Sequence, residues 1–179
     1  MTRLASIVRY REKAMDKAAL VSALSHARLD EPSALAEFAS RQDAQLIDLL
    51  HDWAFVSRKL IEATGREQMR CHAYAKRTTV FCGAENEHDD SGIVWFSLID
   101  LFGRMIHSDH LSIDRARVPT QDGSHARGES AWAFRVASDR DKPGHVNFVY
   151  LEFLLSEFLT FDEQLRHDLR LAEIREANT

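Results

Sequence analysis

The side chains best suited to chemistry lie close together near the middle of the chain. Asp100, Arg104 and His107 fall at i, i+4 and i+7, a spacing that puts them on one face of a helix. Asp109 and His110 follow after Ser108. His107 and His110 also have the H-x-x-H spacing with which a metal site can begin. Asp100, Arg104, His107 and His110 are therefore the candidates for a functional site.

A purely structural role also explains three of them. Arg104 can form an i, i+4 ion pair with Asp100 on a helix surface. His107 then sits near the C-terminal end of the helix, where a positive charge interacts favourably with the helix dipole. In this interpretation the three side chains are the solvent-facing side of a core helix.

The sequence does not favour a metal or cofactor site. A metal needs three or four ligands at fixed geometry, and the chain has no H-E-x-x-H or C-x-x-C motif. Cys71, His72 and Cys82 do not have a zinc spacing. The chain also has no Walker loop, no G-x-G-x-x-G and no G-x-S-x-G. We therefore expect no metal and no cofactor, and a metal hydrolase is the least favoured function.

Arg104 and His110 are separated by five residues, and the segment FGRMIHSDH, residues 102–110, resembles the R-x4-6-H motif of the HEPN superfamily of helical-bundle ribonucleases. The resemblance covers these nine residues and a helical setting. It implies metal-independent cleavage of RNA at a site shared by two subunits, in which the 2′-hydroxyl of the RNA attacks. It also implies that His110 is the acid/base and that Arg104 stabilises the phosphoryl charge.

Two features depart from the family pattern. Met105, which belongs to an apolar stripe, follows the arginine where the family usually has a polar residue. The family motif opens a helix, whereas here it closes one. Because residues six apart on an unbroken helix point to different faces, His107 is the histidine that shares a face with Arg104.

The helix that carries these residues is the clearest element in the sequence. Ser97 precedes it and Asp100 follows three residues later, which is the spacing of a capping box. We expect a helix over residues 98–107 with its apolar stripe in the core. The stripe has the helical spacing i, i+3, i+4, i+7, i+8: Leu98, Leu101, Phe102, Met105 and Ile106.

The rest of the chain divides into helical and strand-like segments. Apolar periodicity predicts one helix over residues 3–28, a second region ending at Gly65, and a long helix from about residue 149 to the end. Alternating residues predict a hairpin of 77–82 with 93–96, a strand at 111–118 paired with 131–138, and a continuation of the sheet at Val146 and Phe148.

These elements predict a helix-dominated α+β fold. Long N-terminal helices and a long C-terminal helix enclose a small antiparallel sheet around the central capped helix. At 179 residues the chain, residues 1–179, fits one globular domain.

Composition limits the function classes. The chain is 45% hydrophobic and 28% charged, as expected of a soluble globular protein, and it has no apolar run long enough for a membrane span. Its two cysteines and its N-terminus without a secretory signal favour the cytoplasm. The net charge of −5 argues against sequence-independent nucleic-acid binding.

The sequence therefore favours a cytoplasmic, non-enzymatic interaction domain. We expect a homodimer, because the long helix 41–64 is apolar on most sides between residues 46 and 55, and a partner can cover what the domain does not. A protein partner fits the same surface. The alternative is a HEPN-like endoribonuclease that uses Arg104 with His110 or His107, and RNA is a partner only in that case.

Overall fold

The computed structural model describes residues 3–27, 36–67, 72–81, 84–86, 93–119, 125–139 and 145–177. Side chains are described at these positions except at 72–81, 84–86, 93–95, 109–110, 114–119, 125–132, 145 and 172–177. The helices are α1 (Arg3–His26), α2 (Ala36–Thr64), α3 (Leu98–Ile106) and α4 (Leu151–Ala177). The strands are β1 (His72–Phe81), β2 (Ala84–Asn86), β3 (Ile93–Ser97), β4 (Ser108–Pro119), β5 (His125–Ser138) and β6 (His145–Tyr150).

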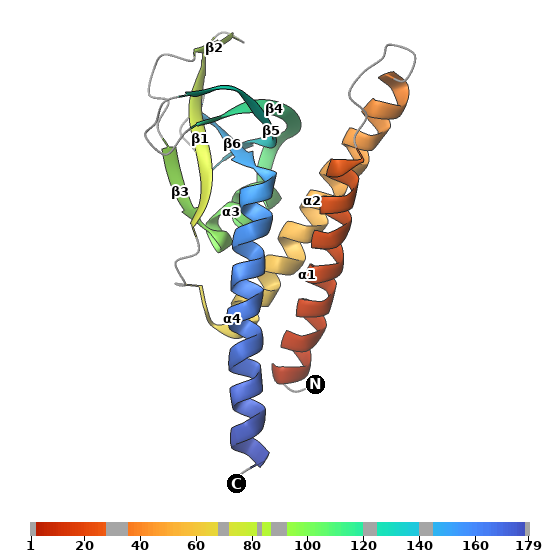
Figure 1. Ribbon diagram of the computed structural model, residues 1–179, viewed down its shortest axis with the longest axis vertical. Helices are drawn as coiled ribbons and strands as arrows, with labels where there is room; N and C mark the ends of the chain where they lie inside the picture. The colour runs from red at the N-terminus through yellow and green to blue at the C-terminus, as the bar shows by residue number, and fades with distance from the viewer. Residues whose placement is uncertain are drawn as a thin grey trace.

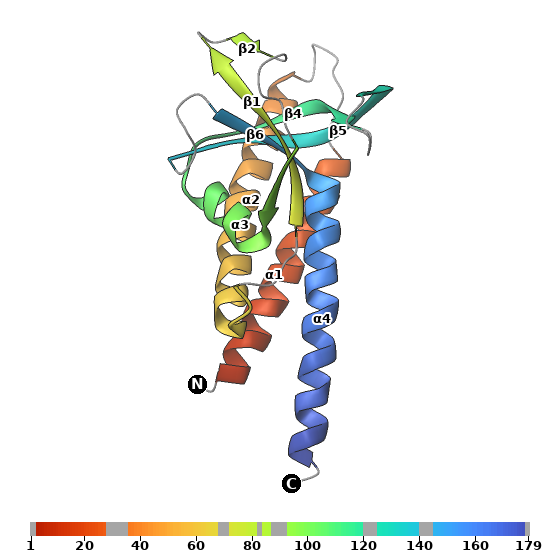
Figure 2. The same ribbon diagram turned by 90° about the vertical axis from the view of Figure 1, so that its left-hand side faces the viewer.

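The fold is the expected α+β arrangement. Helix α4 extends below the antiparallel sheet, α1 and α2 run past one side of it, and the short α3 lies under the sheet beside α2 (Figures 1 and 2). In the described part of the chain, no helix is both long and apolar enough to span a membrane.

Helices α1 and α2 form an antiparallel pair. Each buries residues spaced alternately by three and four, the spacing with which two helices pack along a common seam. Polar contacts join the pair at both ends: Arg3 Nε donates to Ala63 O at 3.0 Å, and Gln42 Nε2 donates to Ala27 O at 3.2 Å. The buried residues are Ile7, Ala14, Ala18, Val21 and Ser25 of α1 and Leu46, Leu50, Trp53, Ala54, Ser57, Leu60 and Ile61 of α2.

Helix α1 differs from the sequence-based expectation in which apolar residues it buries, whereas α2 ends as expected. Leu4 and Val8 fit the apolar periodicity of α1, yet both side chains are 41% exposed because the seam runs through Ile7 instead. Helix α2 ends where expected. Gly65 follows it with φ +69, a left-handed conformation that glycine adopts without the steric cost of a side chain.

The strands form one six-stranded antiparallel sheet. Its order is β2-β1-β6-β5-β4, and β3 pairs with β1 on the same side as β2. The predicted hairpin of 77–82 with 93–96 is wrong in its residues: β3 pairs with residues 72–76 of β1, with His72 opposite Ser97 and Lys76 opposite Ile93. Residues 79–81 of β1 pair instead with β2, which lies between β1 and β3 in the chain.

Strand β6 joins the two halves of the sheet. The expected pairing of 111–118 with 131–138 is present within β4 and β5, and β6 pairs with β5 on one edge and β1 on the other. Residues 146–150 are all buried, as befits a central strand. The chain then passes directly from Tyr150 into Leu151 of α4.

The centre of the core is an aromatic cluster that joins three helices. The ring centroid of Trp53 in α2 lies 5.3 Å from that of Phe102 in α3 and 5.3 Å from that of Phe158 in α4. The Phe102 and Phe158 centroids are 6.3 Å apart. All three pairs meet edge to face, the favoured geometry for aromatic rings. Phe102 therefore fixes α3, which carries the candidate site, against the long helices.

Candidate functional site

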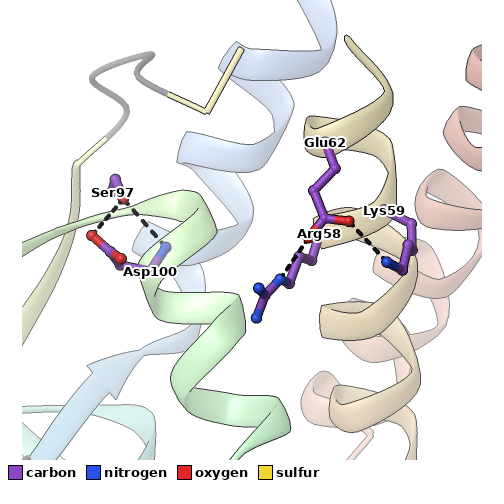
Figure 3. A network of polar contacts seen from close by, with 5 residues as sticks. All are labelled: Arg58, Lys59, Glu62, Ser97 and Asp100. Carbon is purple, nitrogen blue, oxygen red and sulfur yellow. Dashed lines mark hydrogen bonds and ion pairs between the residues drawn. The ribbon is translucent and has the colours of Figure 1, made fainter. Parts of the chain in front are cut away.

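Helix α3 begins at a well-formed cap. Ser97 has extended backbone angles, φ −66 and ψ 154, and its Oγ accepts a hydrogen bond from the Asp100 N–H at 3.2 Å. The same hydroxyl donates to Asp100 Oδ2 at 2.9 Å (Figure 3). The contact between the two side chains replaces the reach of Asp100 to the Ser97 backbone that a full capping box has. The carboxylate of Asp100 is therefore engaged by the hydroxyl of Ser97 at the start of the helix.

The apolar face of α3 packs as expected. Leu98, Leu101, Phe102 and Met105 are buried, and Ile106 is partly buried against the same core. The opposite face carries Asp100, Arg104 and His107. The core side of α3 therefore determines which way the candidate side chains point.

Arg104 packs against an aromatic ring. Its guanidinium carbon lies 4.6 Å from the centroid of the Phe96 ring, a cation–π distance. The Nε atom of Arg104 is buried, and the residue as a whole is half-buried. Phe96, which directly precedes the cap residue Ser97, thus helps to hold the guanidinium of Arg104 in place.

His107 lies at the C-terminal cap of α3 and is exposed. Its backbone N–H donates to Gly103 O at 3.1 Å, which closes the last turn. The chain then enters β4, where His110 pairs with Ala137 of β5. The side chains of Asp109 and His110 lie outside the described residues. The structure thus puts Arg104 and His107 one helical turn apart and His110 on the strand that follows.

A second polar network lies on α2 near α3. Arg58 Nε donates to Glu62 Oε1 at 2.9 Å, and Lys59 Nζ donates to Glu62 Oε2 at 2.8 Å (Figure 3). The hydrogen bonds from Lys59 and Arg58 lower the pKa of Glu62 below its ordinary value, and burial opposes them. Figure 3 shows Arg58 extending from α2 towards α3.

The sequence interpretation did not single out this network, although a signal was present. Arg58 and Glu62 have the i, i+4 spacing at which opposite charges meet on a helix. The contact between Phe96 and Arg104 has no signal in the sequence, because a strand residue and a helix residue meet only once β3 and α3 are positioned in the fold.

The arrangement provides charges but no assembled ligand set for a metal. Within the ranges that the structure describes, no three histidine, cysteine or acidic side chains gather where they could hold a metal ion. What the described residues offer on α3 is an arginine held on an aromatic ring, an exposed imidazole one turn away, and a carboxylate engaged in the cap.

In comparisons with known proteins, the chain matches no family model, no curated protein and no solved structure.

Proposed function

We propose that this chain is a cytoplasmic, non-enzymatic interaction domain that works as a homodimer through its long helices. The observation that carries the proposal is the location of exposed apolar side chains. Among the described residues, the large hydrophobic side chains that are exposed all lie on α1, α2 or α4: Leu4, Val8, Leu20, Phe38, Phe55, Phe153, Leu159 and Leu171.

Single exposed hydrophobic residues are common on protein surfaces, so their number alone carries little weight. More informative is that these residues lie on the long helices α1, α2 and α4. A long helix presents apolar side chains in rows, and such rows bind a helix of a partner. A homodimer is the simplest assembly that supplies such a partner helix.

Sedimentation velocity tests this proposal. We expect a species of twice the 20.5 kDa of the chain at micromolar concentration, dissociating on dilution. A monomer at tens of micromolar would overturn the homodimer. The dimer dissociation constant measured at increasing salt concentration separates the two kinds of contact, because salt weakens exposed charge contacts but not apolar ones.

We propose, as a second candidate, a metal-independent ribonuclease of the HEPN type. Its support is that Arg104 and His107 lie one turn apart on the face of α3 that does not enter the core. Such a site would use a histidine to move protons and Arg104 to stabilise charge on the phosphoryl group.

The test is cleavage of single-stranded RNA in the presence of a chelator. Products with 2′,3′-cyclic phosphate ends are expected, because the attacking group is the 2′-hydroxyl of the RNA itself. Arg104→Ala should abolish cleavage, and the pair His107→Ala and His110→Ala should identify the histidine. Arg104→Lys should not restore activity, since lysine lacks the planar, forked guanidinium.

His107→Ala is the cleanest variant, because His107 is exposed and its loss leaves the core intact. Far-UV circular dichroism of each variant provides the folding control. No cleavage by the wild-type protein, or cleavage that survives the arginine and both histidine changes, would contradict the ribonuclease and leave the interaction domain.

A further inference from the structure

One face of α4 carries a row of exposed and half-buried side chains that we call the α4 stripe. Its members follow one another at intervals of three or four residues, so they lie on one side of the helix. Leu159 is half exposed, at 50%, and Leu155 is partly buried. The charged members are exposed. The stripe consists of Glu152, Leu155, Leu159, Glu163 and Arg166.

Helix α1 lies next to α4 near the stripe. Arg11 of α1 forms an ion pair with Asp162 of α4, which brings the two helices together at this level. Val8 and Leu4 lie one and two turns before Arg11 on the same side of α1 and are each 41% exposed. Because α1 and α4 run in opposite directions (Figure 1), Val8 and Leu4 lie towards the C-terminal end of α4 from this ion pair, whereas Leu159 lies one turn towards its N-terminal end. Helix α4 runs along an edge of the molecule (Figure 2).

The charges of the stripe are complementary to those of a second copy that runs in the opposite direction. Glu152 lies two turns before Leu159, and Arg166 lies two turns after it. A second copy of α4, antiparallel and centred on the same leucine, therefore presents its Arg166 to Glu152 and its Glu152 to Arg166. A parallel copy would place Glu152 against Glu152, which is unfavourable.

We propose that two copies of the chain associate through antiparallel contact of their α4 stripes, with Leu159 against Leu159 at the twofold axis. Leu155 of each copy then contacts the aliphatic part of Glu163 of the other, and a Glu152–Arg166 ion pair closes each end. The proposal rests on the homodimer proposed above and names its interface. The contact is isologous, as a twofold dimer requires.

Charge reversal tests the pairing directly by sedimentation equilibrium. Glu152→Arg alone places two arginines together at both ends, and Arg166→Glu alone places two glutamates together. Each single variant should raise the dimer dissociation constant by about tenfold or more, because two attractive pairs become repulsive. An equimolar mixture of the two variants should regain the wild-type constant, because every pair in the mixed dimer has opposite charges.

Leu159→Glu should give a monomer, because it places two carboxylates on the axis. Leu171→Glu is its matched control: it makes the same change on the same helix at a leucine that is 40% exposed but lies off the stripe, and it should leave the dimer unchanged. Circular dichroism and urea unfolding of all four variants check that α4 remains folded.

The outcomes separate this proposal from the one on which it rests. A monomeric wild-type protein overturns both. A wild-type dimer that tolerates Leu159→Glu, or single-charge variants whose mixture does not regain affinity, overturns the α4 interface and leaves the homodimer standing with another contact surface.

Discussion

Arg11 and Asp162 form a two-bond ion pair that joins the first helix to the last. Arg11 Nε donates to Asp162 Oδ1 at 2.6 Å, and Nη2 donates to Oδ2 at 2.8 Å. The carboxylate side chain is 5% exposed, whereas the arginine side chain is 25% exposed. This forked geometry is the strong form of an arginine–carboxylate contact.

Removal of the arginine should therefore cost more stability than neutralisation of the acid. Arg11→Ala leaves a charged carboxylate almost without water, and we expect a loss of about 2–3 kcal/mol in the free energy of unfolding, below the full cost of a completely buried pair. Asp162→Asn keeps a polar partner for Arg11 and should cost about 1 kcal/mol. Urea unfolding measures both.

The double variant Arg11→Met with Asp162→Leu is the control for this pair. It replaces both charges by apolar groups of similar size and should be close to wild-type stability, as such replacements often are. If Arg11→Ala costs no more than Asp162→Asn, the carboxylate is better hydrated than its exposure indicates.

Phe102 is expected to be the most sensitive residue of α3. It is fully buried and contacts both Trp53 and Phe158. Phe102→Ala should lower the free energy of unfolding by about 3–5 kcal/mol, the usual cost of a large cavity. Phe55→Ala in α2 is the matched control, because its ring is 52% exposed, and it should cost less than about 1 kcal/mol. Similar losses at both positions would contradict the aromatic cluster.

The cap of α3 should make a smaller, separable contribution. Ser97→Ala removes the acceptor of the Asp100 N–H and should destabilise the protein by about 1 kcal/mol. Ser97→Asn can accept the same bond and should recover most of the loss. Thermal unfolding of the three proteins at one pH compares them. Equal stability of the alanine and asparagine variants would mean that the cap hydrogen bond does not matter.

The ionised Glu62 should make a contribution to the free energy of unfolding that is lost in acid and that the variant Glu62→Gln does not have. Because Lys59 and Arg58 lower the pKa of Glu62 in the folded state, its stabilising effect is complete above the ordinary glutamate pKa. The effect is lost as the pH falls below that value and through the lowered pKa. The side chain is 31% exposed, so the difference between wild type and variant at neutral pH should stay below about 1 kcal/mol.

Urea unfolding at a series of pH values measures this difference. It should shrink towards zero in acid, where the wild-type carboxyl is protonated and resembles the amide. A difference that grows with acidity would have the wrong sign for a lowered pKa.

The sequence alone determined the elements whose signals are local. Helix α3 was predictable because its apolar stripe and its serine cap lie within a few residues of one another, and hydrogen bonds of a helix join neighbours in the chain. The end of α2 at Gly65 and the pairing of β4 with β5 followed from equally local signals. The same reasoning identified Asp100, Arg104 and His107 as one face.

The tertiary structure decided which side chains are buried and which residues far apart in the chain contact one another, because both depend on how distant elements pack. The apolar pattern of α1 includes Leu4, Ile7 and Val8 alike, and only the packing of the folded chain shows that Ile7 is buried while the other two are exposed. Likewise, nothing near Arg104 indicated its contact with Phe96, and nothing near Arg11 indicated Asp162. A helical or alternating pattern states which residues share a face but not which partner covers it, because that partner is chosen by the total burial of all the faces at once.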